Sequence, residues 1–232
     1  AELIPSPGME LVLYEKIGLG TGKHANNPWL QELPDPITKS VWDNYVCVAP
    51  SYAKAHNLKN EDVVLINNTI ELPVMVQPGQ HPETIGIALG YGRTSAGKVA
   101  DGIGKNAYPL IDFRNINCRF AGMPVTLEKV NGKTYPLATT QTHHTMEGRA
   151  IVRETTLKQW QENPNSGNEM HKDIMKQNLS LYNLPVFENY HWSMAINLNA
   201  CIGCGNCAIA CQAENNVAVI GKQEVKNRRI MH

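Results

Sequence analysis

Short apolar runs follow one another through the first half of the chain. They occupy residues 10–17, 45–48, 63–66, 69–76 and 84–89, with turn-forming residues between them. Runs of this length bounded by Gly, Asn and Pro are typical of β-strands. Ser51 is placed to cap a short helix over residues 52–56. Strand signals at this spacing with one short helix predict a small β-barrel.

Two other stretches have different patterns. Residues 24–42 are rich in Pro, Asn and Trp without a clear period, and we predict a loop packed on the surface. Residues 125–130 and 134–138 flank Asn131-Gly132, a dipeptide typical of a tight hairpin turn. The second stretch therefore predicts a β-hairpin.

The pattern loosens from residue 121 onward. Residues 155–162 and 168–181 have a helical character, and residues 190–198 alternate as a strand does. We therefore predict an α+β chain, mainly β with some helix, in three parts. The parts are a barrel domain over residues 1–120, a connector with a hairpin and helices over 121–189, and a third part over 190–232.

Four of the six cysteines form a compact run in the third part. They are Cys201, Cys204, Cys207 and Cys211, in the spacing C-x2-C-x2-C-x3-C. Cysteine at every third position lets a tight loop reach three corners of a cubane cluster, and Gly203 and Gly205 let the backbone approach its sulfides. Residues 208–213 favour a helix, which places Cys211 one turn beyond Cys207. The run predicts four ligands of [4Fe-4S] clusters and the first part of a ferredoxin-like module.

Other uses of clustered cysteines fit this run less well. Zinc sites favour two separated C-x2-C pairs or added histidines, and four thiolates so close in the chain crowd a tetrahedron. A disulfide framework spreads its cysteines along the chain. Attachment of c-type haem needs C-x-x-C-H, whereas Gly205 follows Cys204 and Ala208 follows Cys207.

The cysteine run does not by itself complete a module with two clusters. In ferredoxins with two clusters, the fourth cysteine of such a run binds the other cluster. The first cluster then needs another ligand, and only Cys47 and Cys118 remain. Both lie in apolar, strand-like surroundings, so we predict that both are buried and bind no metal. We therefore expect the missing ligands beyond His232, in a longer protein of which this chain is a piece.

Composition, charge and motif spacing argue against several classes of function. Lys and Arg number 21, as do Asp and Glu, so no charge surplus indicates a nucleic-acid partner. No apolar run in the sequence approaches the ~18 residues that a membrane span needs. Gly92, Gly97 and Lys98 have the spacing of a phosphate-binding loop, but Val99 stands where such loops carry Ser or Thr. Nucleotide hydrolysis is therefore not predicted.

Several stretches resemble known families. Residues 201–217, ending in Cys-Gln-Ala-Glu-Asn-Asn-Val, resemble the first cluster motif of iron–sulfur subunits that serve molybdopterin oxidoreductases and polysulfide-type reductases. Residues 27–39, 72–79 and 86–93 resemble the C-terminal domain of molybdopterin oxidoreductases, a double-psi β-barrel. A barrel and a ferredoxin module in one chain is the arrangement of the iron–sulfur subunit of bacterial alternative complex III, which residues 141–149 also resemble.

This resemblance implies a role in a membrane-associated respiratory quinol:cytochrome c oxidoreductase, or in one with another acceptor. In that family the subunit lies on the periplasmic face of the inner membrane, against a polytopic membrane subunit where quinol is oxidised. Its clusters, several [4Fe-4S] and one [3Fe-4S], relay electrons toward c-type haem subunits. The molybdopterin-like part of the family has lost its metal cofactor, so we expect no pterin or nucleotide in residues 1–120.

Two other functions remain open at this point. One is the electron-transfer part of a molybdopterin-dependent reductase of the polysulfide or dimethyl sulfoxide type, which molybdenum in the purified protein would indicate. The other is structural: the barrel docks partners and the cluster holds the fold together. In the leading interpretation the chain is an electron relay and carries no catalytic acid, base or nucleophile.

Overall fold

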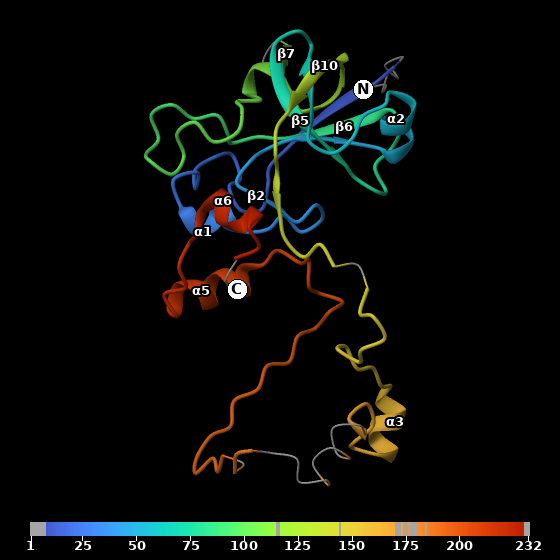
Figure 1. Cartoon of the computed structure of the whole chain (residues 1–232), viewed down its shortest axis with the longest axis vertical. Helices are drawn as coiled ribbons and strands as arrows, with labels where there is room; N and C mark the ends of the chain where they lie inside the picture. Colours follow the sequence, from blue (N-terminus) through green and yellow to red (C-terminus); the bar gives the residue numbers. More distant parts are fainter. Residues whose placement is uncertain are drawn as a thin grey trace. The chain divides into compact units, whose positions relative to one another are not determined.

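Figure 1 shows the computed structural model of the chain, which describes residues 8–114, 117–143, 145–169, 173, 176, 181–183 and 185–229. The chain divides into two compact units. The first unit runs up to Gln141 and resumes at Ile202, and the second comprises residues Thr142–Cys201. Cys201 is therefore the last residue of the second unit, and the other three clustered cysteines belong to the first.

A mixed seven-stranded sheet forms the centre of the first unit, in the order β10-β4-β5-β3-β6-β1-β9. Its strands are β1 (Glu10–Tyr14), β3 (Val46–Val48), β4 (Asp62–Ile66), β5 (Ile70–Val76), β6 (Thr84–Ala88), β9 (Ala121–Pro124) and β10 (Leu127–Thr134). β1 pairs in parallel with β6, and β3 pairs in parallel with β5. The other neighbouring strands are antiparallel.

Shorter elements surround this sheet. They are α1 (Pro28–Glu32), β2 (Ser40–Val41), α2 (Pro50–Ala55), the 3-10 helix η1 (Tyr108–Leu110), β7 (Asp112–Arg114), β8 (Asn117–Arg119), β11 (Ala138–Thr139), α5 (Asn206–Glu214) and α6 (Gly221–Lys226). β2 pairs with β11, and β7 pairs with β8. α2 begins one residue before Ser51 and has Ala49 at its cap position, so the predicted cap is wrong.

The sheet is held together by a core of aliphatic side chains. β1 alternates, with Leu11 and Leu13 buried and the residues between and beside them half-buried. β3, β5 and β6 are buried along most of their length, as expected of central strands that are covered on both faces. The predicted α+β class, with a β-rich N-terminal domain and a ferredoxin-like segment, is confirmed.

Three local predictions are wrong. Asn131-Gly132 forms no hairpin turn, because it lies inside β10, which pairs with β4 on both sides of it. Residues 28–32, predicted as a loop, form α1, which Asn27 caps and Pro28 begins. Residues 190–198 form no strand. An alternating sequence gives a segment one apolar face, but a strand also needs a neighbouring strand to which its backbone can hydrogen-bond.

In the second unit, α3 (Leu157–Glu162) confirms the helix predicted over residues 155–162. Thr156 caps it: the Thr156 hydroxyl accepts a hydrogen bond from the Gln159 N–H, and the Gln159 side chain accepts one from the Thr156 N–H. Most of the helix predicted over residues 168–181 lies outside the described residues. No helix within the described residues is both long and apolar enough to cross a membrane. The boundaries after residues 120 and 189 stay predictions.

Candidate metal centre

Three of the four clustered cysteines lie where the chain enters helix α5. Cys204 precedes the helix, Cys207 lies in its first turn, and Cys211 follows one turn later. Gly205 enters the helix at a left-handed φ of 74°, a conformation that glycine adopts at little cost. The helix predicted around Cys211 is confirmed, and it begins early enough to include Cys207.

Both ends of α5 offer N–H groups to sulfur. No side chain caps the start of the helix, so N–H groups of its first turn remain for cluster sulfides, and the helix dipole favours thiolates there. At the other end, the Asn215 side-chain amide donates to the Cys211 carbonyl oxygen at 2.9 Å and lies 3.5 Å from Cys211 Sγ. Such N–H···S contacts tune a cluster's reduction potential. Asn215 was not predicted from the sequence, although its position four residues after Cys211 on a helix is a usable signal.

The donor set fits an iron–sulfur cluster. All four cysteines are free, Cys207 and Cys211 are exposed, and Cys204 is half-buried. Around Gly203 the space is open, with no atom within 4 Å of the place where a Cβ would stand. Among the described residues, no three His, Cys, Asp or Glu side chains already converge on a single point. The first unit therefore presents one thiol from a glycine-containing loop and two exposed thiols from α5, which suits a bulky cluster better than one enclosed ion.

Cys201 belongs to the second unit, where it closes a local turn. Its N–H donates to the Asn197 carbonyl oxygen at 3.0 Å, and the Asn197 side chain accepts from the Asn199 N–H at 3.0 Å. Its assignment as a ligand of the first cluster rests on the cysteine spacing and stays a prediction.

The segment that follows the cysteines packs on the N-terminal domain, where α5 and α6 lie beside α1 (Figure 1). A Cβ on Gly205 would stand 2.8 Å from Leu33 Cδ1, so the cysteine loop touches the chain just beyond α1. The Trp29 indole Nε1–H donates to the Val217 carbonyl oxygen at 3.0 Å. Val225 of α6 is 1% exposed and packs with Val41 and Trp42. The ferredoxin-like segment and the β domain thus share a packed interface.

Glu32, at the end of α1, joins this interface through its side chain. Its buried carboxylate accepts hydrogen bonds from the Ile220 N–H at 3.1 Å and the Gly221 N–H at 2.8 Å, which begin α6. The indole Nε1–H of Trp42 donates to the same carboxylate at 3.0 Å. A carboxylate from another element therefore takes the role of a helix cap. No signal in the sequence identifies this role, because 189 positions separate Glu32 from Gly221.

A second polar contact joins α6 to the β domain. The Lys222 ammonium forms an ion pair with the buried Asp43 carboxylate and lies 4.0 Å from the centre of the Tyr135 ring. The Tyr135 hydroxyl donates to Asp43 Oδ1 at 3.0 Å. Burial lowers the pKa of Lys222, but Asp43 and Tyr135 oppose this effect and the net pKa is raised. The Lys222 side chain is therefore charged at neutral pH.

Comparison with known proteins agrees with this geometry. Residues 194–214, which include all four clustered cysteines, match the family model of the 4Fe-4S binding domain. The chain carries a ferredoxin-type iron–sulfur motif. The iron–sulfur cluster-binding subunit of a menaquinone reductase from Nitratidesulfovibrio vulgaris (strain Hildenborough) is 63% identical over 27 residues. That match spans 12% of this chain and 11% of the relative, so it describes a short stretch of each protein alone.

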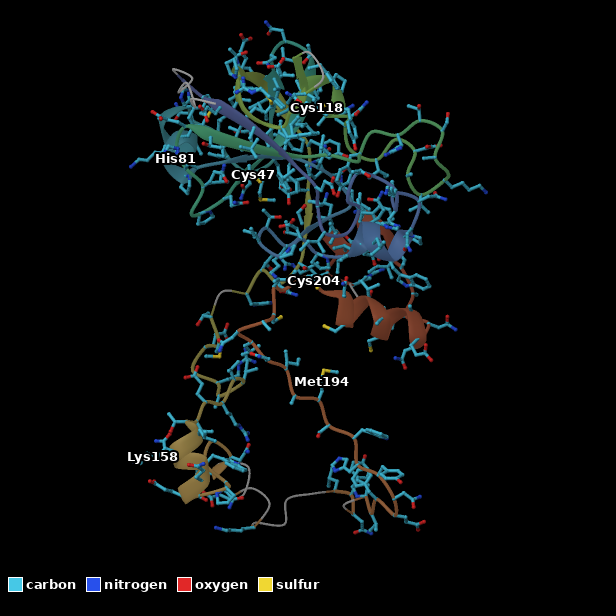
Figure 2. All side chains as sticks on the ribbon, turned by 180° about the vertical axis from the view of Figure 1, so that it is seen from behind. Cys47, His81, Cys118, Lys158, Met194 and Cys204 are labelled. Atoms are coloured by element: carbon cyan, nitrogen blue, oxygen red, sulfur yellow. The ribbon has the colours of Figure 1, made fainter. Side chains whose placement is uncertain are left out.

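Cys47 and Cys118 lie apart from the ferredoxin-type motif (Figure 2). Cys47, in β3, is 3% exposed, and its Sγ lies 3.9 Å from the Tyr14 hydroxyl oxygen. Burial raises the pKa of Cys47 to about 11, so its thiol stays protonated near neutral pH and is a poor metal ligand. Cys118 is exposed, so its predicted burial is wrong. It lies on β8, which pairs with β7 outside the large sheet, and this leaves its side chain in solvent.

Replacing Cys47 or Cys118 with serine is expected to leave the iron content of the protein unchanged. Cys47 is protonated and enclosed, and Cys118 belongs to no group of three or more His, Cys, Asp or Glu side chains among the described residues. The measurement is iron and acid-labile sulfide per protein after anaerobic purification. Loss of a cluster from either variant would show that an isolated cysteine is a ligand.

Proposed function

We propose that the chain belongs to the electron-transfer iron–sulfur subunit of a membrane-associated quinol oxidoreductase of the alternative complex III type. The observation that carries this proposal is that Cys204, Cys207 and Cys211 of the ferredoxin-type motif lie on a segment that packs on a β-rich domain within the first unit. That combination is the arrangement of the iron–sulfur subunit in the family that the sequence resembles. The chain acts as a relay, and its residues need no acid–base or nucleophilic chemistry.

The contribution of this chain is to hold the cluster and set its surroundings. A bound [4Fe-4S] cluster supplies one-electron storage. Cys204, Cys207 and Cys211 provide thiolates from the loop and helix, and Asn215 donates toward the last of these sulfurs. The β domain gives the segment a rigid base through α1. We expect further clusters, one of them [3Fe-4S], in the complete protein and no molybdopterin.

Exposed apolar side chains in the second unit support the proposal that the chain binds a partner protein. Between residues 181 and 198, large apolar side chains are 56% to 93% exposed. They are Leu181, Tyr182, Val186, Phe187, Tyr190, Trp192, Met194, Ile196 and Leu198. So many apolar side chains facing water are unusual on an isolated protein. We propose a polytopic quinol-oxidising membrane subunit and c-type cytochrome subunits as partners, on the periplasmic face of the bacterial inner membrane.

Quinol reduction of the cluster tests this proposal. The complex that contains the chain is purified anaerobically and mixed with a short-chain menaquinol or ubiquinol while electron paramagnetic resonance is recorded. We expect a reduced-cluster signal that appears with quinol and disappears when oxidised cytochrome c is added. A cluster that stays oxidised with every quinol, or that cannot be re-oxidised, would favour the structural role instead.

A second candidate is the electron-transfer part of a molybdopterin-dependent or quinone-reducing enzyme. The similarity to a menaquinone reductase subunit supports electron flow toward a quinone. Metal analysis of the purified complex separates the possibilities, because molybdenum in amounts comparable to the protein would favour a molybdopterin enzyme. Oxidation of the reduced cluster by menaquinone, without cytochrome c reduction, would favour a quinone reductase.

A further inference from the structure

Lys16 is a buried cation of the N-terminal domain. It is 6% exposed, and its ammonium donates to the Asp43 carbonyl oxygen at 3.1 Å. The ammonium also lies 4.5 Å and 5.4 Å from the ring centres of Tyr45 and Tyr91. The ion pairs found among the described residues do not include Lys16. A lysine ammonium has three N–H donors, and the carbonyl oxygen satisfies one of them.

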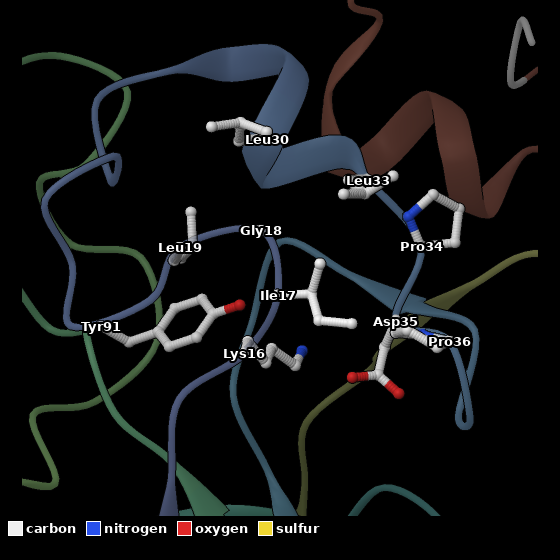
Figure 3. A pocket seen from close by; sticks show the side chains of 10 residues that line it. All are labelled: Lys16, Ile17, Gly18, Leu19, Leu30, Leu33, Pro34, Asp35, Pro36 and Tyr91. Atoms are coloured by element: carbon white, nitrogen blue, oxygen red, sulfur yellow. The ribbon is translucent and has the colours of Figure 1, made fainter. Parts of the chain in front are cut away.

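A small cavity adjoins Lys16 (Figure 3). Its volume of about 10 Å³ is room for about one water molecule. Figure 3 shows the Lys16 ammonium and the Asp35 carboxylate directed toward the same space, with Leu30, Leu33 and Tyr91 among the other walls. A water molecule in this cavity can accept from the ammonium and donate to the carboxylate.

Leu33 is a wall of this cavity and also touches the cysteine loop. Its Cδ1 would stand 2.8 Å from a Cβ on Gly205, the residue after Cys204. One side chain therefore separates the cavity from the loop that holds the cluster. Charges that interact across a protein interior are screened less than charges at the surface. An electron on the cluster and a proton on Lys16 must then favour each other, by the same amount in both directions.

We propose that Lys16 is a proton-binding site whose occupancy is coupled to reduction of the cluster held by the ferredoxin-type motif. The proposal rests on the proposed function, which supplies the electron from a quinol. As one electron enters the cluster, the neutral Lys16 amine takes one proton from solvent, by way of the cavity water, and becomes an ammonium. As the electron leaves, the N–H bond breaks and the proton returns to solvent.

The pKa of Lys16 lies in a range that allows this coupling. Burial lowers the pKa of Lys16 to about 8, while the nearby Asp35, Cys47 and Asp43 act in the opposite direction. Both protonation states are therefore populated around pH 8, and one added negative charge shifts the balance toward the ammonium. Asp43 is itself paired with Lys222, the charged group that α6 contributes to this region.

The thiol and the tyrosine hydroxyls near Lys16 do not titrate near pH 8. Burial raises the pKa of Cys47 to about 11. Burial also raises the pKa of each tyrosine hydroxyl around Lys16, namely those of Tyr14, Tyr45 and Tyr91. A redox-linked proton with an onset near pH 8 therefore belongs to Lys16.

The test is a redox titration of the cluster between pH 6 and pH 10 in the intact complex, followed by electron paramagnetic resonance. In the wild type we expect a constant midpoint potential up to about pH 8, the pKa of Lys16 with the cluster oxidised, and a falling potential above it. Lys16→Met should give a potential that is independent of pH and equal to the wild-type value at high pH. Lys54→Met, on the exposed end of α2, is the matched control and should behave as the wild type.

Asp35→Asn provides a second, milder variant. Loss of the Asp35 charge should move the onset of the slope to lower pH, because that charge raises the pKa of Lys16. A flat wild-type profile, a Lys16→Met profile with the wild-type slope, or an Asp35→Asn profile without a shifted onset would overturn the inference. If quinol reduces the cluster reversibly while the potential is independent of pH, the Lys16 inference fails and the proposed function stands. If no quinol reduces the cluster, the proposed function itself fails.

Discussion

Replacing Cys204 with serine is expected to abolish one cluster signal, and replacing Cys211 with serine is expected to abolish a different one. Cys204 lies on the loop before α5, whereas Cys211 lies well inside that helix. With a helical rise of ~1.5 Å per residue, Cys211 lies about 6 Å along the axis from Cys207. In two-cluster ferredoxins the fourth cysteine of this spacing binds the second cluster. Each substitution should therefore lower its own signal roughly ten-fold or more, since even changes beside a ligand cost 10–100-fold.

Electron paramagnetic resonance of the reduced complex distinguishes the two clusters. Cys118→Ser is a suitable control, because Cys118 is an exposed cysteine on β8, outside the motif. Its spectrum should match that of the wild type. If Cys204→Ser and Cys211→Ser removed the same signal and spared all others, the crossed arrangement would be wrong. A single cluster held by this run alone would then replace it.

Replacing Glu32 with alanine is expected to lower the free energy of unfolding by about 2–4 kcal/mol. The carboxylate accepts from the Trp42 indole and from the N–H groups of Ile220 and Gly221. Alanine leaves these donors without their acceptor inside a packed interface, where an unpaired donor costs more than its hydrogen bond contributed. Glu32→Gln should fall between alanine and the wild type, because its one amide oxygen can replace only part of the carboxylate.

Urea unfolding measures the change in stability, and hydrogen exchange shows where the protein loosens. We expect faster exchange in α5 and α6, which depend on this contact, and little change in the central strands. Glu83→Ala removes an exposed carboxylate and should stay within about 0.5 kcal/mol of the wild type. Equal stability of Glu32→Ala and Glu83→Ala would show that Glu32 does not hold α6 on the β domain.

The sequence by itself predicted the iron–sulfur chemistry of the candidate site. Ligand spacing is a local property, because thiols at every third position allow a loop to wrap a cube whatever surrounds it. The helix around Cys211 follows from Ala-rich local propensity in the same way. Most central strands were also predictable, since runs such as residues 63–66 and 84–88 are apolar and short. The ligand role of the four clustered cysteines stays a prediction.

Local sequence patterns gave wrong predictions where the structure of a segment depends on residues far away in the chain. Asn131-Gly132 has the local chemistry of a turn, but it lies in an irregularity of β10, and the residues on both sides of it pair with β4. Residues 190–198 alternate as a strand does, but they find no hydrogen-bonding partner in a ladder. Cys118 lies in an apolar run, but within the described part of the chain β8 pairs only with β7, and Cys118 is exposed. In each case tertiary context outweighed propensity.

Only the tertiary structure decided how the cluster segment is supported. Glu32 and Gly221 meet although 189 positions separate them, and no periodicity or motif connects them. The burial of Lys16 depends in the same way on Tyr45, Tyr91 and the carbonyl of Asp43, which other parts of the chain bring together. A charge acquires an unusual proton affinity from what surrounds it in space, because desolvation and Coulomb interactions act through distance and not through sequence. The cysteine spacing therefore indicates the cofactor, and the packed β domain determines the electrostatic surroundings in which it works.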